Sequence, residues 1–203
     1  MTKHTHSIDN HVWQRIVLQG KGWVFTPSDF ADLGNRTAVA SALMRYLAAG
    51  QIRQLSRGLY DFPRQHPVLG VLWPDVAQVA LALERKDGLR LQPAGAYAAN
   101  MLGLSEQVPA RVVYLTDGPS RQVAVGPTHI SLKRTTPKNM ACAGRLSGLL
   151  IQALRFLGEV HVTPERITHL RNSLPAEQRA KLTADLAYAP VWMRPWLLKV
   201  ALP

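Results

Sequence analysis

Cysteine is nearly absent from this chain of 203 residues, because Cys142 is the single one. One cysteine cannot form an internal disulfide or supply a cysteine-based zinc cluster, so a secreted disulfide scaffold is excluded. Apolar stretches such as 146–157 are interrupted by Gln152 and Arg155, whereas a membrane-spanning helix needs about 20 apolar residues in succession. The first ten residues are polar and contain no apolar segment of a signal peptide. We therefore expect a soluble cytoplasmic protein.

Acidic side chains are few beside the basic ones. The 13 Asp and Glu residues face 24 Lys and Arg residues, which gives a formal net charge of +11. Such a charge favours a polyanionic partner, because Lys and Arg displace counterions from a nucleic-acid backbone. A merely basic protein without such a partner is the alternative. Apolar residues make up 47% of the chain, which is enough to bury a core.

Signatures of enzymes and cofactor sites are also scarce. The chain has no GxGxxG, P-loop or Gly-x-Ser-x-Gly pattern, its histidines have no ligand spacing, and Cys142 has no nearby histidine. Pro74-Asp75 followed by Glu84-Arg85-Lys86 matches the loose PD-(D/E)xK nuclease pattern. Those nucleases need the Glu and Lys on a strand so that carboxylates share a divalent metal, but the intervening stretch has helical periodicity. We expect no enzyme, no cofactor and no metal. A metal-dependent nucleic-acid enzyme using Asp75, Glu84 and Lys86 is the less favoured alternative.

The chain divides near His66-Pro67, within a proline-containing stretch that separates two different patterns. We expect one domain over residues 1–65 and a second over residues 66–203. Both are basic: the first has eight basic and four acidic side chains, and the second has sixteen and nine. A polyanionic partner can therefore contact either domain.

Three helix signals occur in the first domain. Apolar residues recur at helical spacing over 12–17 and are followed by Gly20 and Gly22. Thr26-Pro27-Ser28-Asp29 combines an N-cap, a first-turn proline and an acidic residue, which predicts the start of a short second helix. Asn35 is the expected N-cap of a third helix that runs to about Ala49.

Two β-prone runs follow, Ile52 to Leu55 and Leu59 to Phe62, separated by the tight turn Ser56-Arg57-Gly58. Two helices joined by a short turn and followed by a hairpin are typical of a winged helix-turn-helix. We therefore interpret residues 1–65 as a DNA-binding domain of that kind.

The third helix has the composition of a recognition helix, in which small side chains approach the bases and a few arginines reach them. Its residues expected to read the major groove are Arg36, Thr37, Ser41 and Arg45. On the hairpin, Arg53 and Arg57 are expected to contact phosphate or the minor groove. The alternatives are that Arg36 and Arg45 are ordinary surface residues, or that the winged helix binds another protein.

Several short motifs occur together along residues 25–145. They are Phe30-Ala31-Asp32-Leu33-Gly34, Ala42-Leu43 with Leu47 and Gly50, Ile52 with Leu55, Arg57-Gly58-Leu59-Tyr60, and more weakly Gly95-Ala96-Tyr97-Ala98-Ala99-Asn100-Met101-Leu102-Gly103-Leu104 with Arg111-Val112-Val113-Tyr114-Leu115-Thr116. With these motifs, which cover about half of the chain, the protein resembles the AbiEi-type antitoxins of type IV toxin–antitoxin systems.

This resemblance implies a two-part protein. Its winged helix would bind inverted repeats of double-stranded DNA in its own promoter and repress the operon. Its C-terminal domain would counteract a nucleotidyltransferase-type toxin, without forming a stable complex with it. The resemblance transfers no catalytic residue. A transcriptional regulator without a toxin partner, whose C-terminal domain senses a ligand or another partner, is the alternative.

The second domain has a mixed pattern. Helical periodicity over 73–86 and 94–102 precedes β-branched runs at 111–116, 121–125 and 129–134, and helical segments return from 144 to 200. We expect a small antiparallel sheet packed by several helices, and an α+β class for the whole chain. The apolar last helix, around Trp192 and Trp196, is expected to be core, with a subunit interface as the alternative.

A cluster of basic residues lies in the middle of this second domain. Its members are Arg121, Lys133, Arg134, Lys138 and Arg145. Such a patch is suited to antitoxin function, to an extended DNA footprint, or to binding RNA or an acidic partner. A solvated rim without a partner explains the same residues equally well.

Overall fold

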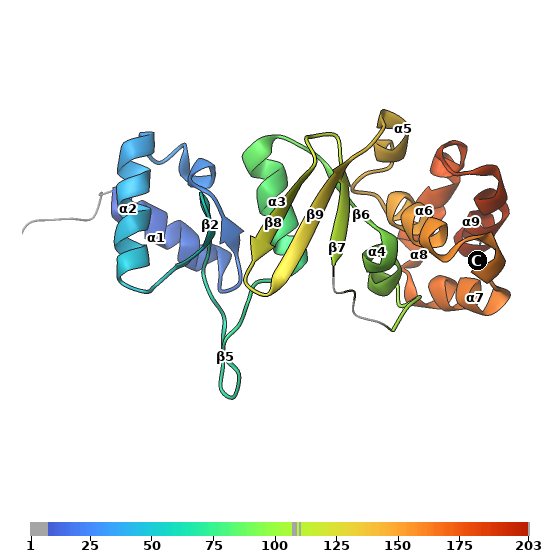
Figure 1. Cartoon of the computed structure of the whole chain (residues 1–203), viewed down its shortest axis with the longest axis horizontal. Helices are drawn as coiled ribbons and strands as arrows, with labels where there is room; N and C mark the ends of the chain where they lie inside the picture. The colour runs from blue at the N-terminus through green and yellow to red at the C-terminus, as the bar shows by residue number, and fades with distance from the viewer. Residues whose placement is uncertain (1–7, 107–108, 110, 203) are drawn as a thin grey trace, which may run out of the picture. The chain divides into compact units, whose positions relative to one another are not determined.

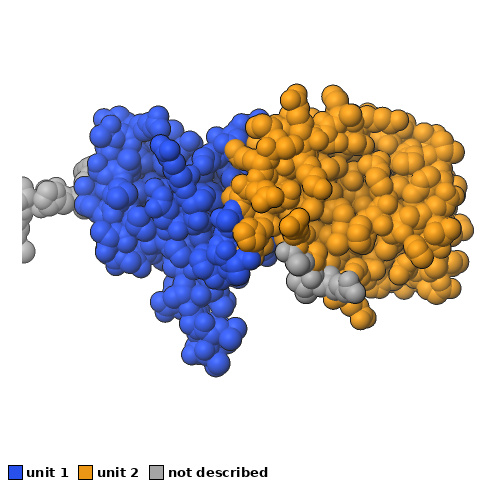
Figure 2. All heavy atoms as spheres, viewed as in Figure 1, with its two compact units in different colours: residues 1–88, 124–127 blue, residues 89–123, 128–203 orange. Residues whose placement is uncertain are grey.

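The computed structural model describes residues 8–106, 109 and 111–202. The chain forms two compact units (Figure 2). Unit 1 extends to Gly88 and includes residues 124–127, and unit 2 comprises residues 89–123 and 128–203. The domain boundary expected near His66-Pro67 falls inside unit 1, because residues 66–88 pack with the first part of the chain.

Unit 1 combines three helices with short strands (Figure 1). In chain order its elements are α1 (Ile8–Gln19), β1 (Val24–Phe25), the 3₁₀ helix η1 (Pro27–Phe30), α2 (Arg36–Ala48), β2 (Arg53–Ser56), β3 (Leu59–Asp61), β4 (Gln65–His66), β5 (Gly70–Val71) and α3 (Val76–Asp87). The second helix expected from Thr26 is a single 3₁₀ turn. Strand β1, which no pattern in the sequence predicts, pairs antiparallel with β3 and completes a sheet of order β1-β3-β2.

Capping residues set the ends of these elements. The Asn35 side chain accepts a hydrogen bond from the Ala38 N–H at 2.9 Å, which fixes the start of α2. Gly50 adopts a φ of +67° just beyond its end. At η1, the Asp29 carboxylate accepts from the Thr26 N–H at 2.8 Å. The first turn of α2 therefore has a defined position beside η1.

The core of unit 1 lies between α1, η1, α2 and the three-stranded sheet. Phe25 and Phe30 are fully buried and meet edge to face at 5.6 Å, while Trp13 stacks on Tyr46 at 4.9 Å. The fully and largely buried members of this core are Val12, Ile16, Phe25, Phe30, Val39, Ala42, Leu43, Ile52 and Tyr60. One face of α2 is thereby buried and held rigidly, which leaves the opposite face open.

An ion pair joins α1 to the segment after η1. Arg15 donates to both carboxylate oxygens of Asp32, at 2.6 and 2.7 Å, and to the Asp29 carbonyl at 2.8 Å. The hydrogen bonds from Arg15 lower the pKa of Asp32 from its ordinary 3.8 to about 2.

This lowered pKa gives a testable pH dependence. Because the folded-state pKa lies below the ordinary value, the Arg15–Asp32 interaction stabilises unit 1 above pH 3.8 and is lost as the pH falls toward about 2. A carboxyl titration followed by NMR should give a pKa of about 2 for Asp32, and in Arg15→Gln it should return toward 3.8. An unchanged Asp32 titration in that variant would contradict the assignment.

Strands β4 and β5 form a two-stranded arm that extends away from α1 and α2 (Figure 1). Its turn is organised by His66, whose Nδ1 accepts from the N–H groups of Val68 and Leu69 at 3.2 Å each. Val68 at the tip is 85% exposed. The arm belongs to unit 1 and follows the end of β3 that is opposite the Ser56–Gly58 turn, so it starts away from that turn.

Unit 2 contains a four-stranded sheet and most of the helices. Its elements are β6 (Leu91–Ala94), α4 (Gly95–Met101), β7 (Val112–Thr116), β8 (Arg121–Val125), β9 (Thr128–Arg134), α5 (Pro137–Met140), α6 (Leu146–Leu157), η2 (Glu159–His161), α7 (Pro164–Ser173), α8 (Ala176–Ala180), η3 (Lys181–Tyr188), η4 (Val191–Met193) and α9 (Arg194–Ala201). The tip of the β8–β9 hairpin, residues 124–127, belongs to unit 1. The predicted α+β class is confirmed.

The sheet of unit 2 has the strand order β6-β7-β9-β8. Strands β6 and β7 are antiparallel, as expected, but β7 and β9 pair in parallel, with Tyr114 opposite Leu132. The difference arises because β8 turns back through Gly126-Pro127 into β9, and β9 then lies between β8 and β7. Neighbours in sequence are therefore not always neighbours in the sheet.

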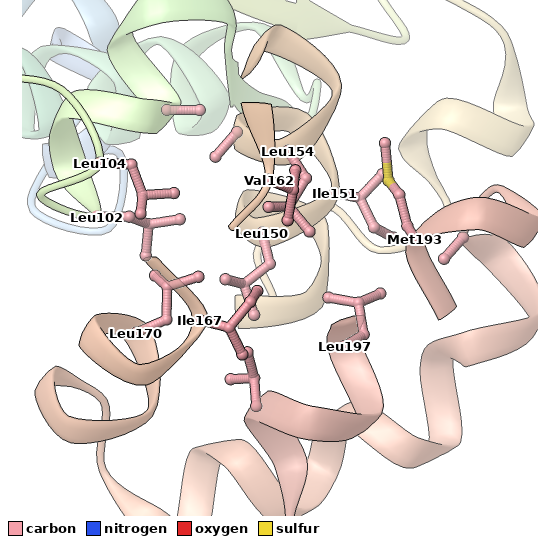
Figure 3. Close-up of a cluster of buried hydrophobic side chains, with 14 of the residues drawn as sticks. Leu102, Leu104, Leu150, Ile151, Leu154, Val162, Ile167, Leu170, Met193 and Leu197 are labelled. Carbon is pink, nitrogen blue, oxygen red and sulfur yellow. The ribbon is translucent and has the colours of Figure 1, made fainter. Parts of the chain in front are cut away.

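A helical core fills the rest of unit 2 (Figure 3). Leu150 and Leu154 of α6 are fully buried and lie in one cluster with Leu170 of α7 and Leu197 of α9. Leu197 and Val200 of the last helix are thus core, as expected, Trp192 and Trp196 pack partly buried against it, and Leu198 is exposed. A Cβ on Gly148 would overlap the Cys142 carbonyl oxygen, so the first turn of α6 depends on this glycine. Within the described residues, no helix is both long and apolar enough to cross a membrane.

Candidate nucleic-acid interface

Helix α2 presents two contrasting faces. Val39, Ala42 and Leu43 are buried in the core of unit 1. The opposite stripe is exposed and consists of Arg36, Thr37, Ala40, Ser41, Met44 and Arg45. Helical periodicity places these side chains on one side, because residues three and four apart lie above one another. The stripe is small or polar along most of its length, with an arginine at its first turn.

Arg36 is the first residue of α2 and is exposed. It forms no ion pair with any of the residues that the structure describes. Because the side chain of the preceding residue, Asn35, caps α2, the position of the Arg36 backbone is fixed. The exposed Arg36 guanidinium is free to contact a ligand. Thr37 and Ser41 follow on the same exposed face.

Arg45 lies on the same helix but already has a partner. Its guanidinium forms a bidentate ion pair with Asp9 of α1, with Nε 2.8 Å from the carboxylate, and the neighbouring Tyr46 hydroxyl donates to the Asp9 carbonyl at 2.9 Å. The Arg45 side chain is still 61% exposed. Its main role in the structure is to tie the end of α2 to the start of α1.

Arg53 has an internal role. Its guanidinium donates to both carboxylate oxygens of Asp61, at 3.0 and 2.6 Å, and to the Leu72 carbonyl at 2.8 Å. It also lies over the Trp73 ring, 4.3 Å from the ring centroid. The Asp61 side chain is only 1% exposed. A guanidinium held from several sides in this way is poorly placed for the phosphate contact expected from the sequence.

The buried pair gives a prediction about stability. Arg53→Ala should lower the free energy of unfolding by about 3–5 kcal/mol, because it leaves a buried carboxylate without its counter-ion. Arg57→Ala, the matched change at the exposed residue directly after β2, should cost little. Urea denaturation of both variants measures the difference. Equal stability of the two variants would show that Arg53 is not structural.

Arg57 and Gly58 form the turn of the β2–β3 hairpin. Arg57 is exposed, and Gly58 adopts a φ of +69°, which other residues rarely reach. The Lys86 ammonium, at the end of α3, donates to the Arg57 carbonyl at 3.0 Å. The turn is therefore anchored through its backbone, while the Arg57 side chain projects outward.

A cleft of about 530 Å³ opens beside the first turn of α2. Its walls come from η1, from the start of α2, from the hairpin turn and from the end of α3. The lining residues are Thr26, Pro27, Ser28, Ala31, Gly34, Arg36, Val39, Gly58, Lys86 and Asp87. The sequence does not predict this cleft, because the expected domain boundary at residue 65 separates α3 from α2 and Lys86 is a candidate there only for the nuclease-like motif.

The nuclease-like motif does not assemble into a site. Asp75 is the N-cap of α3, where its carboxylate accepts from the Ala77 N–H at 2.7 Å. Glu84 lies in the last turns of the same helix, roughly 13 Å further along its axis. Over residues 8–106, 109 and 111–202, no three His, Cys, Asp or Glu side chains gather closely enough to hold a metal ion. The two carboxylates therefore do not converge on a shared position.

The basic residues of unit 2 differ in their surroundings. Lys133, Arg134 and Lys138 are exposed. Arg145 is paired with the buried Asp185, which also accepts a hydrogen bond from the Ser147 hydroxyl. Arg121, in β8, is only partly exposed. Three of the five expected residues, Lys133, Arg134 and Lys138, are therefore exposed and form no ion pair within the described residues, and we call them the open cations.

These open cations do not all point the same way. Successive residues of a strand face opposite sides of a sheet, so Lys133 and Arg134 of β9 project on different sides. Lys138 follows in the short helix α5, whose first residue is Pro137. The three cations therefore surround the end of β9 rather than forming one flat surface.

Comparison with known proteins places the chain in a family without assigning it a function. A family model described as a family of unknown function, DUF6088, matches residues 11–182, so the chain belongs to that family. The crystal structure of the RV2827C protein from Mycobacterium tuberculosis is similar at 18% sequence identity and a TM-score of 0.41, over 92% of this chain and 81% of that one. Among curated proteins, none matches.

Proposed function

We propose that this DUF6088 protein is a DNA-binding autoregulator that resembles AbiEi-type antitoxins, and that α1, η1, α2 and the β2–β3 hairpin form a winged helix-turn-helix. The observation that carries the proposal is the exposed face of α2, where Arg36, Thr37 and Ser41 line one stripe above a buried core. An exposed helix face with this composition suits the major groove of double-stranded DNA.

The chemistry of the stripe supports this use. Thr37 and Ser41 are short, so α2 can approach the base edges closely, and their hydroxyls donate and accept hydrogen bonds. Arg36 at the first turn carries the planar guanidinium that pairs bidentately with guanine. Residues near the N-terminus of a recognition helix commonly contact the bases. We therefore assign the base reading to Arg36, Thr37 and Ser41.

The hairpin supplies a second contact. Arg57 projects from its turn, and a basic turn of this kind suits a phosphate or the minor groove. Arg45 and Arg53 take a lesser part in this proposal, because Asp9 and Asp61 already hold their guanidinium groups. The proposed interface is thus built around Arg36 and Arg57, which form no ion pair within the described part of the chain.

The test is a comparison of duplexes. Full-length protein should bind the DNA just upstream of its own gene more tightly than scrambled DNA at about 0.15 M salt. Arg36→Ala should weaken binding to the upstream DNA by about 1–3 kcal/mol and reduce its preference over scrambled DNA, because a base contact is lost. Arg45→Ala, on the same helix, is the matched control and should change the affinity much less.

Gel shifts or fluorescence anisotropy across a salt series measure these affinities. Unchanged upstream binding by Arg36→Ala would remove α2 from base reading. Equal binding of wild-type protein to both duplexes, with collapse on added salt, would leave only non-specific electrostatic attraction.

For unit 2 we propose the antitoxin function, namely neutralisation of a nucleotidyltransferase-type toxin without a stable complex. The open cations Lys133, Arg134 and Lys138 around the end of β9 are the candidate residues, because they are exposed and form no ion pair with the residues that the structure describes, whereas Arg145 is paired with Asp185. A surface of this charge suits an RNA or an acidic protein surface.

Co-expression with the product of an adjacent nucleotidyltransferase-type gene tests this role. Changing Lys133, Arg134 and Lys138 together to Gln should reduce growth rescue and leave upstream DNA binding intact, because α2 and the β2–β3 hairpin lie in unit 1. Full rescue by the triple variant would exclude the surface. Absence of any such neighbouring gene would favour a regulator without a toxin partner.

A further inference from the structure

We infer that the cleft beside the first turn of α2 is a binding site for a phosphodiester of the DNA backbone, with Lys86 of α3 as its second cation beside Arg36. This inference rests on the proposed function and deepens it. It brings into the interface a helix that lies outside the expected DNA-binding segment, residues 1–65. The juxtaposition of Arg36, the hairpin turn and Lys86 around one open cleft is the observation behind it.

Lys86 is held at the cleft by its own hydrogen bond. Its ammonium donates to the Arg57 carbonyl at 3.0 Å, and a Cβ on Gly58 would lie 3.6 Å from the same nitrogen. The bond to Arg57 uses one N–H of the ammonium, which has further donors for a ligand. The side chain is exposed, so those donors are accessible.

The neighbouring Arg85 fixes the end of α3 against the other wall of the cleft. Its Nε donates to the Asp29 carboxylate of η1 at 2.8 Å, and a terminal nitrogen donates to the Val24 carbonyl at 3.0 Å. Asp29 in turn holds Thr26 at the cleft's edge. Two adjacent residues of α3 thus connect η1 to the hairpin turn, and the ammonium is positioned before any ligand arrives.

The charge and shape of the cleft select the ligand class. Arg36 and Lys86 supply two positive charges, and Asp87 supplies one negative charge. The resulting single positive charge matches the single negative charge of a phosphodiester. Ser28 in the lining adds a hydroxyl group, whereas the Thr26 hydroxyl is buried and donates to the Asp29 carboxylate at 3.1 Å. Because the cleft is open and adjoins the base-reading stripe, a continuous DNA strand fits it better than an enclosed small molecule does.

The test uses the full-length protein and three lysine variants. Lys86→Gln removes the charge but keeps an N–H donor for the Arg57 carbonyl, so its effect reports the charge. We expect it to weaken binding roughly 3- to 10-fold for upstream and scrambled duplexes alike, and to reduce the salt slope by about one. Lys86→Arg should retain most of the affinity and the slope. Lys21→Gln is the matched control, because Lys21 is an exposed lysine of unit 1 that lines a different cleft.

The outcomes separate this inference from the proposed function. If Lys86→Gln leaves affinity and salt slope unchanged while Arg36→Ala loses the upstream preference, the phosphate site is wrong and the winged-helix proposal stands. If wild-type protein shows no upstream preference, that proposal fails, and the salt slope on scrambled duplex still decides the phosphate site. An equal loss in Lys21→Gln would show a general charge effect and overturn the site. Thermal melting of each variant confirms that it is folded.

Discussion

The ion pair between Arg53 and Asp61 is the interaction on which the arrangement of unit 1 depends. The register of β2 and β3 places these residues opposite each other, and the same guanidinium reaches forward to the Leu72 carbonyl and lies against Trp73. It therefore joins the hairpin to the segment that returns from the β4–β5 arm. Helix α3 begins directly after this segment, with Asp75 as its N-cap, and ends at the hairpin turn. The position of Lys86 follows from where α3 begins.

Local signals in the sequence were sufficient for most elements. Asn35 predicts the start of α2 because an N-cap acts on the N–H groups of the next three residues, and the structure shows that bond. The Ser56-Arg57-Gly58 turn is similarly local, because Gly58 alone supplies the positive φ. The second helix is a shorter 3₁₀ turn, although Asp29 caps its start at Thr26 as the sequence indicates.

Features that depend on contacts between residues distant in the sequence could not be predicted from local sequence patterns. The parallel pairing of β7 with β9 depends on how the β8–β9 hairpin folds back, which no single stretch encodes. Arg53 and Arg57 have the same residue type on the same hairpin, yet only Arg53 faces a buried carboxylate. Likewise Arg45 and Arg36 share a helix, and only Arg45 meets Asp9. The carboxylate that decides each role lies eight or more residues away, so helix or strand periodicity carries no information about it.

Ion pairs between arginines and carboxylates also reduce how much of the net positive charge is available to an external anion. A charge of +11 counts every cation equally, but a guanidinium held by a carboxylate presents little field to a phosphate, because the pair is close to neutral at a distance. In unit 1, Asp9, Asp32 and Asp61 each neutralise an arginine of the helices or the hairpin. The field that remains near α2 comes from Arg36, Arg57 and Lys86, which lie around its first turn and the hairpin turn. Ion pairing thus concentrates the available positive charge at one end of the helix, which is where the proposed function would have a DNA strand lie.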